Sequence, residues 1–79
     1  MISKIKVNGR VFENPRFVGF ATYGVGDGSL MVIESAGKMY AISLLRGEAY
    51  PVVQHGAGLY VEIPYAEGRV YRVPLRFKL

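Results

Sequence analysis

Cationic side chains lie near both ends of this 79-residue chain, at a spacing that suits a polyanion. Lys4 and Lys6 alternate near the start, and Arg72, Arg76 and Lys78 share one alternation near the end. Alternate side chains of an extended strand lie on one face, roughly 6.6 Å apart. That distance is close to the axial rise of two nucleotides along one strand, roughly 6.8 Å. These residues are therefore candidates for binding phosphates.

The charge of the chain is divided between two basic ends and an acidic middle. Residues 1–16 carry four cations against one acid, residues 69–79 carry four cations and no acid, and residues 17–68 carry two cations and five acids. Chain termini often lie close together, and closure of a barrel brings late strands back to early ones. We therefore predict that the two basic ends form one outward-facing patch. The competing interpretation is a solvated face whose Lys and Arg keep terminal edge strands from pairing with other molecules.

An aromatic side chain is expected beside this patch. Pairing of Ile63 with Arg69 would close a hairpin around residues 64–68. That register sets Tyr60 opposite Arg72 on the outer side, where an exposed ring could stack on a nucleobase. The predicted nucleic-acid-binding residues are thus Lys4, Lys6, Tyr60, Arg72, Arg76 and Lys78.

The remaining polar residues show no pattern for catalysis or metal binding. A general base needs a nucleophile or acid beside it, and the sequence around His55 supplies neither, so a surface or interface histidine is expected. The acidic residues are scattered singly and Cys is absent, which offers no hard-metal site, acid/base pair, disulfide or thiolate zinc site. We therefore expect a protein that is not an enzyme and that has no metal and no cofactor.

Three glycines, Gly24, Gly26 and Gly28, raise the question of a phosphate-binding loop. In loops of that type, the phosphate is bound by backbone amides of the loop and of the start of the helix that follows it. Here the next segment, SLMVIES, is a predicted strand. The glycines are therefore interpreted as a flexible hairpin loop, whose tip could still contact a partner.

Strands must position all of these side chains. Val, Ile, Tyr, Phe and Leu recur in short runs punctuated by Gly, Pro or Asn, which is typical of short strands joined by tight turns. We expect about seven strands, with two-residue turns at Asn8-Gly9 and Ala36-Gly37, a bend at Gly19, and an edge or bulge at Pro51. No window has the periodicity and caps of a helix longer than one turn. The predicted fold is a single all-β domain over residues 1–79, a small antiparallel barrel of the SH3-like or OB-like kind.

One short segment resembles a known family. The stretch LLRGEAYPV resembles the apolar-Arg-Gly signature of Sm-like RNA-binding proteins, whose Arg-Gly lies between two late strands, as Arg46-Gly47 is expected to do here. The chain departs from that family because it lacks the N-terminal helix, and Gly19-Phe20 is followed by Ala-Thr-Tyr where the family has Asp and Asn. It also has a further hairpin after the motif. We therefore do not assign the chain to that family.

The composition favours association with a partner or with another copy. Hydrophobic residues make up 51% of the chain, and a domain of this length hides only roughly 60 to 65% of the surface that its unfolded form exposes. No apolar stretch is long enough for a membrane span or a signal peptide, so a cytoplasmic location is the default expectation. The low content of Asn and Gln and the absence of Cys are a bias of thermophile proteins.

Two functions compete on this basis. The leading hypothesis is a non-enzymatic small β-barrel that uses the basic face to bind RNA or DNA, or to dock onto a nucleoprotein complex, with low sequence specificity. The alternative is a self-associating structural or assembly subunit, for example viral or accessory, with no affinity for nucleic acid. In the alternative, the basic terminal strands of one copy would meet the acidic middle of its neighbour.

Overall fold

The computed structural model describes residues 3–23, 29–64 and 66–78, and these residues form an all-β domain, as predicted. The strands are β1 (Lys4–Val7), β2 (Arg10–Glu13), β3 (Arg16–Tyr23), β4 (Leu30–Ser35), β5 (Lys38–Ser43), β6 (Glu48–His55), β7 (Gly58–Pro64) and β8 (Val70–Phe77). The one helical segment in the described part of the chain is a single 3-10 turn, η1 (Ala66–Gly68). None of the described helices is long and apolar enough to cross a membrane.

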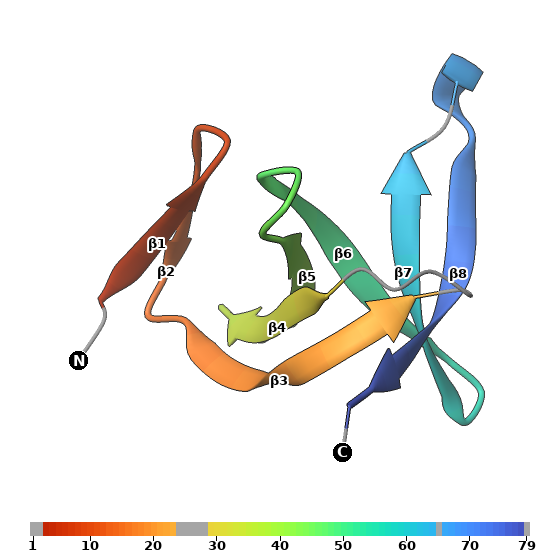
Figure 1. Ribbon diagram of the computed structural model, residues 1–79, viewed down its shortest axis with the longest axis horizontal. Helices are drawn as coiled ribbons and strands as arrows, with labels where there is room; N and C mark the ends of the chain where they lie inside the picture. The colour runs from red at the N-terminus through yellow and green to blue at the C-terminus, as the bar shows by residue number, and fades with distance from the viewer. Residues whose placement is uncertain (1–2, 24–28, 65, 79) are drawn as a thin grey trace.

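A closed antiparallel barrel forms the body of the molecule. Each strand from β3 to β8 pairs with the next, and β8 pairs back with β3 to close the barrel (Figure 1). The predicted turn between β4 and β5 is confirmed, because Ser35 pairs with Lys38 and both Ala36 and Gly37 have positive φ. The two-residue turn therefore fixes the register of this hairpin and the face on which each of its side chains lies.

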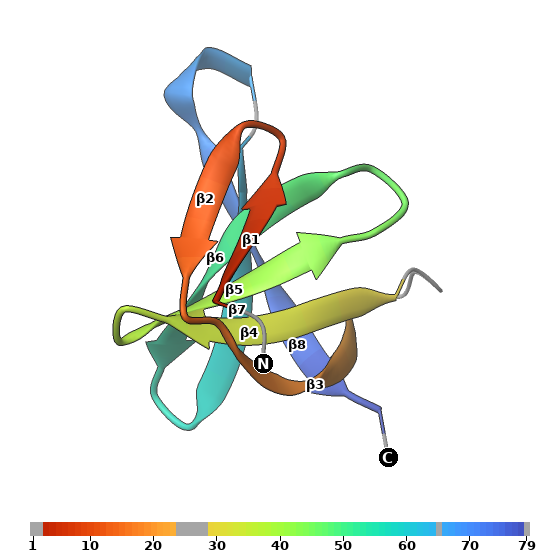
Figure 2. The ribbon, with the colours of Figure 1, turned by 90° about the vertical axis from the view of Figure 1, so that its left-hand side faces the viewer.

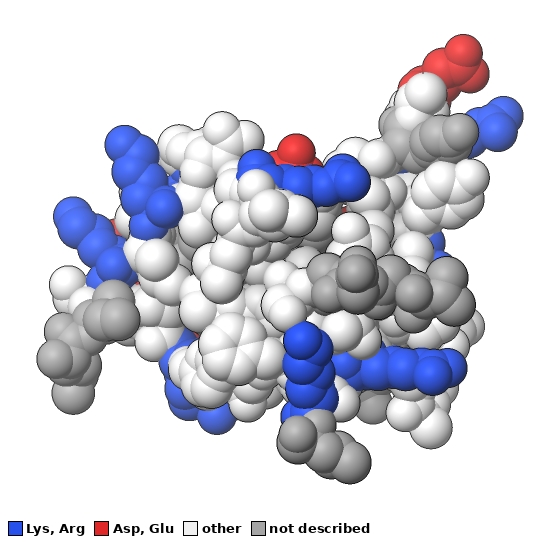
Figure 3. Space-filling model, viewed as in Figure 1, with Lys and Arg blue, Asp and Glu red and all other residues white. Residues whose placement is uncertain are grey.

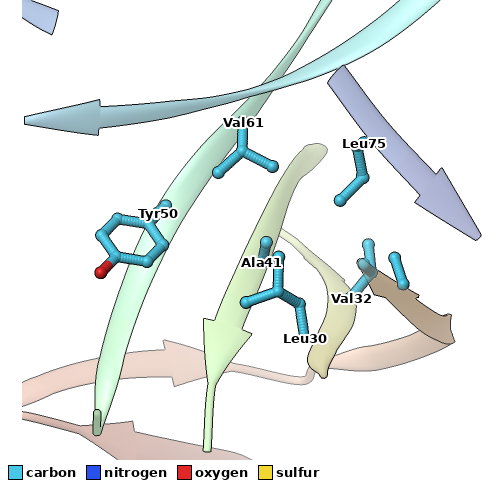
Figure 4. Packing of buried hydrophobic residues seen from close by; sticks show 7 residues of the cluster. Leu30, Val32, Ala41, Tyr50, Val61 and Leu75 are labelled. Carbon is cyan, nitrogen blue, oxygen red and sulfur yellow. The ribbon is translucent and has the colours of Figure 1, made fainter. Parts of the chain in front are cut away.

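The inside of the barrel is filled by alternate side chains of all six strands. The buried residues of this cluster are Ala21, Leu30, Val32, Ala41, Tyr50, Val61 and Leu75. Those drawn in Figure 4 point toward one another from different strands. The interior is thus a packed core, and any binding surface must lie on the outer face or at the ends of the barrel.

A second apolar cluster lies outside the barrel, under the β1–β2 hairpin. The hairpin turns at Asn8 and Gly9, whose φ angles of 49° and 81° fit the predicted two-residue turn. Its buried residue Phe12 packs with Ile33 of β4 and Ile42 of β5. Figure 2 shows the hairpin lying over the outside of these two strands. The two faces of the β4–β5 hairpin are therefore both covered, one by the barrel core and the other by the β1–β2 hairpin.

The predicted bend in β3 is present as a β-bulge. Phe17 pairs with Ile33 and Gly19 pairs with Val32, which leaves Val18 as an extra residue. A Cβ atom added at Gly19 would lie 3.2 Å from the ring of Phe77, so the absence of a side chain lets that ring pack closely on the strand. The bulge changes the alternation, and both Phe17 and Phe20 are exposed.

Pro51 lies where β6 changes partner. It pairs with Tyr40 of β5, whereas the described pairing of β6 with β7 begins only at Val52 and runs from there to the turn. Proline has no N–H to donate to a second neighbour. β6 is an inner strand of the closed barrel and not an edge strand, but Pro51 lies at a position of it that, in the described pairings, pairs on the β5 side alone.

Candidate nucleic-acid interface

The structure does not pair the two basic ends of the chain. β1 pairs with β2 in a separate two-stranded sheet, and the barrel closes between β8 and β3. The expectation that closure would bring the last strand back to the first was wrong, because Ile5, Val7 and Phe12 pack the hairpin onto the outside of β4 and β5. Figures 1 and 2 place this hairpin and β8 on opposite sides of the molecule. Figure 3 shows cations spread over several parts of one face.

The predicted pairing of Tyr60 with Arg72 is also wrong. Pro64 pairs with Val70, so Tyr60 faces Pro74 and Arg72 faces Glu62. The shift arises at η1, where Glu67 and Gly68 both have positive φ and move the loop one residue along the chain. The new register gains an opposite-charge pair across the strands.

An ion pair therefore offsets part of the charge of Arg72. Its Nε lies 3.1 Å from Oε2 of Glu62. The Arg72 side chain is nevertheless 59% exposed, and a guanidinium has five N–H donors. Arg72 can therefore still donate to a phosphate, although its net contribution to binding is reduced.

Three of the predicted cations do share one surface, the outward face of β8. Leu75 is buried in the core, and Val73 is half-buried and pairs with the buried Val61, so Arg72, Arg76 and Lys78 alternate on the other face. Tyr60 lies beside this row on β7, opposite Pro74. We call the outward residues Tyr60, Arg72, Pro74, Arg76 and Lys78 the β8 strip.

Lys78 extends the strip onto β3. Its backbone N–H donates to the carbonyl of Phe20 at 2.9 Å, which continues the β3–β8 pairing beyond the end of β8. Its ammonium donates to the hydroxyl of Ser29 at 2.7 Å. An ammonium has three donors, so Lys78 can hold this bond and still bind an anion.

Two exposed phenylalanines adjoin the strip, and neither was among the predicted binding residues. Phe17 and Phe20 are 55% and 46% exposed, and their ring centroids lie 5.2 Å apart in an edge-to-face arrangement. With Gly19, Ser29 and Lys78 they line an open depression of about 530 Å³. A bend at Gly19 was predicted for this segment, and the phenylalanines on either side of that glycine in RFVGFATY were the available signal for an exposed ring pair.

Lys4 and Lys6 lie on the solvent face of the β1–β2 hairpin. Lys4 pairs with Glu13 and Lys6 pairs with Val11, while Ile5 and Val7 of the same strand are half-buried against the barrel. This placement separates Lys4 and Lys6 from the β8 strip. Any part that they play in binding a polyanion acts from the other side of the molecule.

A second cleft, of about 550 Å³, lies between the β1–β2 turn and the open ends of β6 and β7, and includes Arg10, Arg46, Glu48 and Tyr50. The hydroxyl of Tyr50 donates to the carboxylate of Glu48. Burial of the phenol, together with this hydrogen bond and the nearby negative charge, raises the pKa of Tyr50 from 10.0 to about 12. The polar groups of this cleft are thus partly occupied with one another.

This tyrosine predicts a loss of stability at high pH. The folded state holds the Tyr50 proton more tightly than the unfolded chain does, so its stabilising effect is complete below pH 10 and is lost as the pH rises to about 12. The loss should be on the order of 2 kcal/mol in the free energy of unfolding. Denaturant unfolding of the wild type and of Tyr50→Phe across this range measures it, because the phenylalanine variant lacks the titration. Parallel curves for the two proteins would contradict the prediction.

No group of three or more His, Asp or Glu residues that could hold a metal ion occurs within residues 3–23, 29–64 and 66–78. His55 is exposed at the end of β6, with its ring centroid 6.4 Å from that of Tyr60. The predicted glycine-rich loop at 24–28 lies outside the described residues.

Comparisons of the chain with protein families, with curated proteins and with solved structures found no match.

Proposed function

We propose that this chain is a non-enzymatic small β-barrel that binds RNA or DNA, free or within a nucleoprotein complex, through the β8 strip. The observation that supports the proposal best is the row of Arg72, Arg76 and Lys78 on one outward face, beside exposed aromatic rings. Three cations stand there against one acid, Glu62. Cations at alternate strand positions can follow a phosphate backbone, and rings beside them can contact bases.

Low sequence specificity follows from the kind of groups on the strip. Lys and Arg side chains on a convex outer face contact phosphates, which carry no sequence information. Phenyl rings stack on any base because every base has a flat π-face. Lys4 and Lys6, on the other side of the molecule, would add long-range attraction without contacting the same nucleotides.

A salt titration tests this function. Three phosphate contacts should make log K fall against log salt concentration with a slope of roughly −2 on single strands and roughly −2.7 on a duplex. Fluorescence anisotropy with labelled oligonucleotides of RNA and DNA gives both slopes. Affinity that does not change with salt, or no binding at low salt, would rule the proposal out.

Self-association is a second candidate, because large apolar side chains are also exposed outside the β8 strip. Leu44 and Leu45, in the turn between β5 and β6, are 62% and 91% exposed. Exposed apolar side chains of this size favour contact with another protein surface. A defined oligomer in light scattering with no affinity for nucleic acid would favour this candidate, and a monomer at micromolar concentration would count against it.

A further inference from the structure

We infer that the surface formed by the β8 strip with Phe17 and Phe20 selects single-stranded over double-stranded nucleic acid. This inference rests on the proposed function and specifies its ligand. The relevant features are the exposed ring pair, the cations next to it and the way in which a duplex hides its bases. The rings and the hidden base faces of a duplex favour the single strand, and the cations bind the phosphates of either form.

The ring pair is built as a surface for stacking. Phe17 and Phe20 flank the bulge in β3, which turns both of them outward, and their mutual contact at 5.2 Å keeps the rings in place without covering them. Their neighbours across the strands, Ile33 and Met31, belong to the apolar cluster under the hairpin. The pair is therefore the uncovered edge of a packed apolar layer, and little conformational freedom is lost when a base stacks on it.

A cation lies next to this surface. Lys78 is directly opposite Phe20 across the β3–β8 pairing, and its ammonium reaches Ser29 at the rim of the same depression. Arg76 pairs with Thr22, one step further along the outward face. A nucleotide offers an anionic phosphate and a flat base, and this surface presents a cation and a ring at adjacent positions to meet them.

A duplex cannot use the rings. Its base faces are stacked on one another, and a base must be extruded before a side chain can stack on it. The cations alone would give the opposite preference, since a phosphate contact releases more counterion from a duplex than from a single strand. A preference for the single strand would therefore arise from stacking on the rings and not from the charges.

The experiment compares three probes on the full chain at one salt concentration. They are a labelled mixed-sequence DNA single strand of about 16 nucleotides, the duplex of the same sequence, and a single strand of the same length made of abasic sites. We expect the wild type to bind the single strand about tenfold more tightly than either of the other probes. The double variant Phe17→Leu/Phe20→Leu, which keeps apolar side chains but removes the rings, should lose this preference and keep the salt slope of the wild type.

A variant in the β5–β6 turn is the matched control. Leu45→Ala removes an exposed apolar side chain away from the β8 strip and should bind as the wild type does. Equal affinity of the wild type for single strand and duplex, or an unchanged preference in the leucine variant, would overturn the inference while leaving the proposed function in place. No binding to any probe would overturn the proposed function itself. The leucine variant counts only if its thermal unfolding midpoint stays close to that of the wild type.

Discussion

Replacing Phe12 with alanine is expected to lower the free energy of unfolding by about 3 to 5 kcal/mol. Phe12 is 3% exposed, its ring lies 4.7 Å from that of Tyr40, and it is the buried residue that the hairpin contributes to the outer apolar cluster. The guanidinium of Arg10 lies 4.9 Å from the centre of the Phe12 ring and would lose that contact as well. A domain of this size has little stability to spare, so the loss would be a large part of the total.

Urea unfolding of Phe12→Ala measures this loss, and Val11→Ala is the matched control. Val11 is the preceding residue of β2 and is exposed on the opposite face of the hairpin, so its truncation should change stability by less than about 0.5 kcal/mol. Hydrogen exchange should show amide protection falling most in β1 and β2, because those strands pair only with each other in the described sheets. Equal losses in the two variants would mean that the hairpin is not held by its apolar face.

Turn chemistry made much of the fold predictable. Asn8-Gly9 and Ala36-Gly37 each close a two-residue turn, and alternation then gives the register of both hairpins. Gly19 and Pro51 mark the bulge and the change of partner, because one lacks a side chain and the other lacks an N–H. These are local properties of single residues, and a sequence shows them directly.

The pairings between strands that are far apart in the sequence could not be predicted in this way. Alternation predicts which face of a strand is apolar, but not whether β1 or β3 will close the barrel against β8. The last hairpin moved by one loop residue because Glu67 took up a left-handed conformation, which turned a predicted Tyr60–Arg72 pair into an ion pair of Arg72 with Glu62. The candidate site therefore differs from the predicted one. In place of one patch made by both basic ends, the structure has the β8 strip and a separate basic hairpin.

Because the hairpin and the β8 strip are separate, the effect of where the charges lie can be tested with two variants that have the same net charge. The double variants Arg76→Glu/Lys78→Glu and Lys4→Glu/Lys6→Glu each replace two exposed cations on one strand face with two acids. The first should weaken binding to single-stranded nucleic acid by at least about 100-fold, because it removes two of three phosphate contacts and adds repulsion. The second should weaken binding only a few-fold. Anisotropy titrations at about 0.1 M salt measure both, with circular dichroism to verify folding.

The contrast depends on screening. The molecule extends 33 Å along its longest axis, and the hairpin and β8 lie on opposite sides of it (Figure 1). The Debye length is about 10 Å at 0.1 M ionic strength, so charges on the hairpin are largely screened from a ligand on the β8 strip. If net charge alone governed binding, the two variants would lose the same affinity, and the β8 strip would be no more than a solvated face. A much larger loss in Arg76→Glu/Lys78→Glu than in Lys4→Glu/Lys6→Glu would mean that the phosphates contact β8.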